Sequence, residues 1–290
     1  MKRRNFISAS AVASVGLFAG NTANAMPSLK NMTIKELKGN INHSACRWCY
    51  SKIPLEELLQ HFNKLGIKAL DLTGPEEWPL MKKYGIHASM CWGAGKGILE
   101  GFNDPKLHAE LIADYTQMIP KVAEAGYTNL ICFSGNRNGM DDKVGLKNCA
   151  EGLKKLMPLA EKHGVILQME LLNSKVDHKD YMCDNSAWGI ELCKLIGSEN
   201  FKLLYDIYHM QIMEGDVIRN IQDYHQYFGH YHTGGNPGRH EINETQELNY
   251  PAIMKAILAT GFKGHVAQEF IPTWKNPIAA LEEGITICDV

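Results

Sequence analysis

The residues best suited to chemistry in this sequence stand where short apolar runs end. The stretch 201–211 (FKLLYDIYHMQ) begins with an apolar run that is typical of a buried strand. The run ends on Asp206, and His209 follows three residues later. If the fold is a barrel of parallel strands, such groups belong at the carboxyl ends of the strands, where barrel enzymes carry their active sites.

Three further apolar runs end on, or carry, groups of the same kind. Glu170 ends the segment LQME (167–170), His230 and His232 lie in the run 228–232, and Glu269 ends the segment VAQE (266–269). The spacings from Glu170 to Asp206, His232 and Glu269 are 36, 26 and 37 residues in succession. Each spacing is close to one β/α unit of about 30 residues. Four successive strands would therefore each place one metal-ligand side chain at the same rim.

Glu170, Asp206, His232 and Glu269 offer three carboxylates and one imidazole. Mixed oxygen and nitrogen ligation without thiolate suits one divalent ion, with Mn, Mg or Co favoured and Zn also compatible. A bound ion would polarise a carbonyl group and acidify the neighbouring C–H bond. Glu170 and Glu269 could then remove and return that proton. The pattern predicts isomerisation or epimerisation beside a carbonyl group.

Other residues near these positions have two readings each. His209 could contact a substrate hydroxyl or orient Asp206 from behind. Arg239 lies in a polar loop and could hold a carboxylate or carbonyl oxygen, or be an ordinary loop charge. Trp48 and Trp92, with Phe133, could line a sugar pocket or belong to the core. His230 shares a strand face with His232, and we expect it to be buried behind the site.

The elements that must position these residues alternate regularly along the chain. The predicted strands are 41–45, 67–72, 86–91, 128–133, 165–172, 201–207, 228–232 and 264–270. The predicted helices are 55–65, a short helix ending at 84, and then 104–125, 141–163, 186–196, 215–224, 251–259 and 277–288. Eight such units without a shift in composition predict one α/β domain, a (β/α)8 TIM barrel with a parallel eight-stranded barrel, over residues 39–290. A doubly wound sheet is less consistent, because no glycine-rich fingerprint follows the first strand.

The amino-terminal segment has the pattern of a targeting signal rather than of a part of the fold. Arg3 and Arg4 precede a mildly apolar run, and Ala23-Asn24-Ala25 offers a cleavage site. This predicts a twin-arginine signal peptide over 1–25, a linker over 26–38 and an exported, periplasmic protein with no membrane span after cleavage. Removing 1–25 takes away three basic residues and no acidic one, which changes the formal charge from −2 to −5. That balance argues against nucleic acid as a partner.

The eight cysteines give no second metal motif. Cys46 and Cys49 have the spacing of a zinc or redox pair, but no second pair follows to complete a zinc site. The sequence does not decide whether these two cysteines form a disulfide. The other cysteines stand singly in apolar runs, and we expect them to be small buried side chains.

The chain resembles the xylose-isomerase-like TIM-barrel superfamily, and within it the hydroxypyruvate isomerase branch, over about residues 40–290. The segments that carry the resemblance are CRWCY (46–50), LTGPEEW (72–78), DIYHMQIMEG (206–215), NPGR (236–239) and ELNY (247–250). The resemblance implies that Glu170 and Glu269 are the acid/base pair and that both bind the metal together with Asp206 and His232. It also implies that His209 and Arg239 contact the substrate.

One segment, GHYHTG (229–234), looks more like the ketose 3-epimerase branch, since hydroxypyruvate isomerases tend to have Gln at the position of His232. The predicted substrate is therefore a sugar or small hydroxy-carbonyl compound. A lyase acting on oxidised, 3-keto glycosides would use the same proton abstraction. Two other classes are a metal-dependent phosphodiesterase like the apurinic endonucleases and an exported sugar-binding protein without catalysis. The sequence leaves open whether the protein forms a homo-oligomer.

Overall fold

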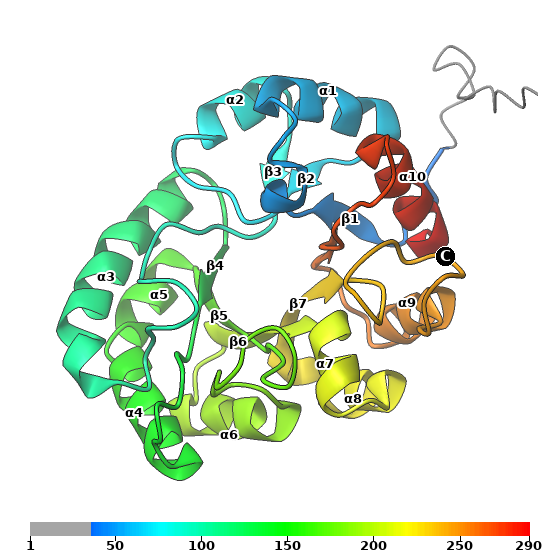
Figure 1. Cartoon of the computed structure of the whole chain (residues 1–290). Helices are drawn as coiled ribbons and strands as arrows, with labels where there is room; N and C mark the ends of the chain where they lie inside the picture. The colour runs from blue at the N-terminus through cyan, green and yellow to red at the C-terminus, as the bar shows by residue number, and fades with distance from the viewer. Residues whose placement is uncertain (1–35) are drawn as a thin grey trace, which may run out of the picture. The chain divides into compact units, whose positions relative to one another are not determined.

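The computed structural model describes residues 36–290, in which parallel strands alternate with helices that lie outside them (Figure 1). The strands are β1 (Asn42–Ala45), β2 (Ala69–Leu70), β3 (His87–Ala88), β4 (Asn129–Cys132), β5 (Ile166–Glu170), β6 (Phe201–Asp206), β7 (Phe228–Thr233) and β8 (His265–Gln268). The α-helices are α1 (Leu55–Leu65), α2 (Trp78–Lys83), α3 (His108–Glu124), α4 (Asp142–Lys154), α5 (Met157–His163), α6 (Ser186–Ile196), α7 (Ile207–Met213), α8 (Val217–Tyr224), α9 (Tyr250–Ala259) and α10 (Pro277–Cys288).

The strands form a curled parallel sheet of the TIM-barrel type. Six of them pair in the order β1-β8-β7-β6-β5-β4, and β2 pairs with β3 in a separate ladder. Isolated parallel bridges join Cys46 to Asp71 and Cys91 to Leu130, so that single residue pairs connect the short ladder to both ends of the long one. The first and last strands of the chain pair directly, with Ala45 opposite Gln268.

Local chemistry explains where several helices begin and end. Helix α1 starts after Pro54 and ends at Gly66, which takes the left-handed conformation that glycine tolerates best. Helix α6 begins at Asn185, whose side chain accepts a hydrogen bond from the Trp188 amide, and it ends at the left-handed Gly197. Asp206 caps α7 in the same way by accepting from the His209 amide. This cap fixes the backbone at the point where β6 delivers a candidate ligand.

The strand and helix predictions are confirmed in order, with three local corrections. The predicted helix 141–163 is two helices, α4 and α5, because the chain breaks where Pro158 occupies the first turn of α5, a position that needs no backbone donor. Helix α7 was not predicted, since it follows β6 without a connecting loop. The second and third strands are two residues long, shorter than their apolar runs.

The predicted signal peptide and nearly all of the predicted linker lie outside the described residues. Residues 35–290 form one compact unit. Among residues 36–290, no helix is long and apolar enough to cross a membrane. The side chains of the parallel strands and the inner faces of the helices build one large apolar core, which supports the strand ends where the candidate ligands lie.

Candidate active site

The structure brings the four predicted metal ligands together at the carboxyl ends of four adjacent strands. Glu170 ends β5, Asp206 ends β6, His232 lies near the end of β7, and Glu269 directly follows β8. One ligand atom from each residue lies within 4.8 Å of the ligand atoms of the others. All four residues are buried. Parallel pairing places Asp206 opposite His232, which explains how residues far apart in sequence meet.

His232 Nδ1 is the centre of this cluster. It lies 2.7 Å from Glu269 Oε2 and 3.3 Å from Glu170 Oε1. The two glutamates therefore approach the same imidazole nitrogen from two neighbouring directions. This is the pair for which the sequence predicts acid and base roles.

Arg239 balances part of the negative charge. Its Nη2 donates to Glu269 Oε2 at 2.8 Å and lies 3.5 Å from Asp206 Oδ2. Its guanidinium group also lies over the rings of Trp48 and Tyr208, with centroid distances of 5.3 Å and 5.6 Å. The loop after β7 thus brings Arg239 into the site, where it contacts carboxylates of the protein itself.

His209 is fully buried behind Asp206. Its backbone amide donates to Asp206 Oδ1, and its Nε2 lies 3.6 Å from Asp206 Oδ2. Its Nδ1 lies 2.6 Å from the side-chain amide of Asn173. Of the two roles considered for His209, this position favours orienting Asp206.

The surroundings shift the pKa values of Glu170, Asp206 and Glu269 in different directions. Burial raises the pKa of Glu170 above its usual value, and it raises the pKa of Asp206 further. Burial would also raise the pKa of Glu269, but His232 and Arg239 hold it well below its usual range. Carboxyl groups whose pKa values are separated in this way can serve as acid and base in one site.

A cavity of about 610 Å³ opens at this rim. Glu170 and Glu269 line it together with Arg239, while Asp206 and His232 lie behind them. Its apolar walls are Trp48, Leu72, Trp92, Ile98, Ile131, Phe133 and Leu172. The other lining residues are Arg47, Glu76, Glu77, Gly97 and His178.

Trp48 and Trp92, for which the sequence left a pocket wall or a core position open, both line this cavity. Trp48 and Trp92 remain 40% and 50% exposed, so their rings are available to a ligand. Trp48 also donates from Nε1 to Glu269 Oε1 at 2.7 Å, a contact that the sequence did not predict. Because Arg239 and Trp48 hold one oxygen of Glu269 each, the orientation of this carboxylate is fixed.

The residues present fit a divalent cation. Their donor set is three carboxylates and one imidazole, the mixture that Mn²⁺, Mg²⁺, Co²⁺ and Zn²⁺ accept. Glu170 Oε1 is buried and, among the described residues, has no hydrogen-bond partner. A buried carboxylate oxygen without a donor is costly unless a cation or another donor satisfies it.

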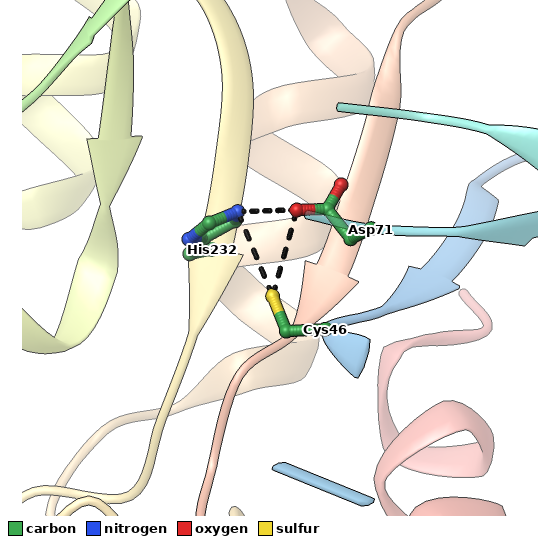
Figure 2. Close-up of side chains that lie close together, drawn as sticks. All are labelled: Cys46, Asp71 and His232. Atoms are coloured by element: carbon green, nitrogen blue, oxygen red, sulfur yellow. Dashed lines mark hydrogen bonds and ion pairs between the residues drawn. The ribbon is translucent and has the colours of Figure 1, made fainter. Parts of the chain in front are cut away.

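A second buried cluster lies on the other side of His232. Asp71 directly follows β2 and contacts His232 Nε2 at 3.0 Å, with Cys46 Sγ beside both (Figure 2). Asp71 was not among the site residues predicted from the sequence. The signal was available, because an apolar run ends on this carboxylate just as others end on Glu170 and Asp206.

The structure also shows the pairing and burial of the cysteines and the burial of His230. All eight cysteines are unpaired, so Cys46 and Cys49 form no disulfide, and every cysteine except Cys49 is buried. His230 is fully buried, as expected from its place on the same strand face as His232.

Curated proteins similar to this chain include two isomerases. The 2-oxo-tetronate isomerase of Cupriavidus necator is 34% identical over 113 residues, which cover 39% of this chain and 43% of that protein. The hydroxypyruvate isomerase of Escherichia coli is 30% identical over 122 residues, covering 42% and 46%. In both cases the chain spans less than half the length of the curated relative that it matches.

Solved structures show the same fold at low sequence identity. An AP endonuclease of family 2 from Brucella melitensis superposes with a TM-score of 0.76 at 21% identity, covering 83% of this chain and 97% of that one. The 3-keto-D-glucoside 4-epimerase of E. coli gives 0.72 at 17%, covering 85% and 98%. The IOLI protein, solved with a zinc atom, gives 0.67 at 15%, covering 86% and 95%.

The family model described as xylose isomerase-like TIM barrel matches residues 55–288. That range contains all four clustered candidate ligands and Arg239. The resemblance read from the sequence is confirmed: this chain belongs to the xylose isomerase-like TIM-barrel family.

Proposed function

We propose that this protein is a divalent-metal-dependent isomerase or epimerase that acts on a sugar or a small hydroxy-carbonyl compound. The observation that carries the proposal is the placement of Glu170 and Glu269. Both line one cavity, and both converge on His232 Nδ1 within 3.3 Å. The relatives named as 2-oxo-tetronate and hydroxypyruvate isomerases support this class of reaction.

Glu170, Asp206, His232 and Glu269 would hold the ion. When bound, the ion would polarise the substrate carbonyl and acidify the adjacent C–H bond. One glutamate accepts the proton and the other returns a proton, either to the neighbouring carbon in an isomerisation or to the opposite face of the same carbon in an epimerisation. The two carboxyl groups suit these roles because they face the same cavity and differ in their hydrogen bonds.

The other side chains support this chemistry without taking part in proton transfer. Arg239 and Trp48 keep Glu269 ionised and oriented. The apolar walls from Leu72, Ile131 and Phe133 keep water away from the reacting carbon. The exposed faces of Trp48 and Trp92 offer surfaces on which a sugar ring can pack. We also infer that the eight strands close into one barrel. The single-residue bridges at both ends of the β2–β3 ladder support this closure.

The test is a turnover assay with hydroxypyruvate, free ketoses and 3-keto sugars in the presence of Mn²⁺. We expect one of these classes to be converted, and we expect Glu170→Gln and Glu269→Gln to lower turnover by about 10²–10⁴-fold, the usual contribution of a general acid or base. Circular dichroism of both variants should match the parent protein. Full activity in both variants would refute the mechanism. Zn²⁺-dependent cleavage of abasic DNA without any isomerase activity would favour the phosphodiesterase instead.

We also propose that residues 1–25 direct export through a twin-arginine pathway. The support is the sequence pattern of Arg3 and Arg4 before an apolar run and a small-residue cleavage site. Replacement of both arginines by lysine should leave the precursor in the cytoplasmic fraction. A periplasmic location that this double change does not affect would contradict the proposal.

A further inference from the structure

His232 is held from both sides by carboxylates. Its Nδ1 faces Glu269 and Glu170, and its Nε2 lies 3.0 Å from Asp71 Oδ1. Asp71 directly follows β2, whereas His232 comes from β7 (Figure 2). Both are fully buried. The site described above uses only the Nδ1 side, so the Nε2 side needs its own explanation.

Groups of the protein surround both oxygens of the Asp71 carboxylate. His232 Nε2 and the Cys46 thiol approach Oδ1, at 3.0 Å and 3.5 Å. Ser89 Oγ donates to Oδ2 at 2.5 Å, and His230 Nε2 lies 2.8 Å from the same atom. A carboxylate offers about four acceptor positions; Cys46, Ser89 and His232 use three of them, and His230 Nε2 lies close to Oδ2 without a hydrogen bond. The carboxylate is therefore held rigidly and presents one oxygen to His232.

This occupancy separates two readings of the cluster. Cys46, Asp71 and His232 lie close enough to hold an ion of their own. An ion there would have to displace Ser89 or His230 from Asp71, or the Asp71 contact from His232 Nε2. A supporting role displaces nothing, because the contacts of Asp71 with His232, Ser89 and Cys46 are already made. The geometry favours support of His232 over a second metal site.

We propose that Asp71 is the positioning residue for His232. By accepting from Nε2–H, it fixes the imidazole tautomer and ring orientation so that the Nδ1 lone pair faces Glu170, Asp206 and Glu269. Carboxylates that accept from the far nitrogen of a metal-binding histidine generally raise metal affinity in this way. The inference rests on the proposed function, since it assigns to Asp71 a role at the proposed metal site.

Asp71→Asn tests the role with little change in volume. Purified metal-free protein is titrated with Co²⁺ against a chromophoric chelator, and the absorption spectrum of the Co²⁺ protein is recorded. We expect Asp71→Asn to weaken Co²⁺ binding about 10–100-fold, the usual effect of losing such a partner, and to shift the Co²⁺ bands. Ser89→Ala, which loosens Asp71 without removing it, should give a smaller change in the same direction.

Asp289→Asn is the matched control. Asp289 is also a buried aspartate, but it accepts from the Lys38 amide at the amino end of β1, away from the ligands. This change should leave Co²⁺ affinity and spectrum unaltered. If Asp71→Asn fails to fold, as judged by circular dichroism of the metal-free protein, Ser89→Ala carries the test.

Three outcomes would overturn the inference. Parental Co²⁺ affinity and spectrum in the folded Asp71→Asn variant, or in Ser89→Ala if it is the variant that folds, would show that the contact does not position His232. Two Co²⁺ per chain, with a sulfur-to-cobalt band that Cys46→Ser removes, would make Asp71 a ligand of a second ion. A parent protein that binds no Co²⁺, Mn²⁺ or Zn²⁺ would remove the proposed function and this inference together, which distinguishes it from the first two results.

Discussion

His232 near the carboxyl end of β7 and His265 at the amino end of β8 lie on neighbouring strands. Their surroundings nevertheless shift their pKa values in opposite directions. Burial would lower the pKa of His232, but Cys46, Glu269 and Asp71 raise it well above its usual value. Burial lowers the pKa of His265 to about 4, helped by His230 and His87 and opposed only weakly by Asp71. His265 stacks on His87, with ring centroids 5.8 Å apart.

The same contrast extends to the other groups at each end. The carboxyl-end cluster consists of Glu170, Asp206, His232, Arg239 and Glu269, and its members are ion-paired with one another. The amino-end histidines are His43, His87 and His265, and burial lowers the pKa of each. Burial alone therefore does not decide the charge of a histidine here. At His232 the surrounding carboxylates outweigh burial, whereas at His265 burial prevails.

Among the changes that would break this contrast, replacement of Arg239 is expected to have the largest effect on stability. Its side chain is 14% exposed and pairs with Asp206 and Glu269. Arg239→Met should destabilise the metal-free protein by about 3–5 kcal/mol, because it leaves buried carboxylates without their cation. Chemical denaturation at pH 7 measures the change.

Arg219→Met is the control for this prediction. Arg219 also forms an ion pair, with Asp216 at 2.7 Å, but both side chains are largely exposed. Its loss should cost less than about 1 kcal/mol. Equal losses in the two variants would show that the carboxyl-end cluster is not a buried charge network.

The next effect concerns metal addition. If the cluster binds one divalent ion, Mn²⁺ at about 100 times its Kd should stabilise the protein by about 2.7 kcal/mol. For a chain of this size that corresponds to a rise in melting temperature of roughly 5–10 °C. Glu170→Gln, which removes the negative charge of a carboxylate that has an unpartnered oxygen, should reduce the rise. No shift in the parent protein with Mn²⁺, Mg²⁺, Co²⁺ or Zn²⁺ would speak against a metal site.

The smallest effect belongs to the amino end and concerns pH. The pKa of His265 is about 4 in the folded protein and about 6.5 when the chain is unfolded. The unfolded chain therefore binds more protons between these values, so His265 removes stability as the pH falls from about 6.5 to 4. His265→Asn should flatten the stability profile in that window, measured by urea denaturation at several pH values.

His225→Asn, at an exposed position, is the control and should leave the loss of stability at acidic pH unchanged. If His265→Asn does not change the loss of stability at acidic pH, the His265 imidazole is solvated or paired in the folded state. Such a result would remove the contrast between the two ends of the strands.

Much of this molecule follows from local pattern. The order of strands and helices, the bounds of α1, α6 and α10, and the convergence of Glu170, Asp206, His232 and Glu269 could all be predicted from the sequence. They were predictable because apolar periodicity marks the elements, and because parallel strands bring their carboxyl ends to one rim. Predicting that these four residues converge needed only the repeat length of the β/α unit.

The sequence by itself determined the family, the alternation of elements and which side chains meet at the rim. Only the tertiary structure decided what each of those side chains touches. Asp71 supports His232 across 161 residues of sequence, and Trp48 holds Glu269 across 221. Side-chain contacts between distant strands depend on the curvature of the sheet and on rotamers, neither of which has a period that can be read along the chain.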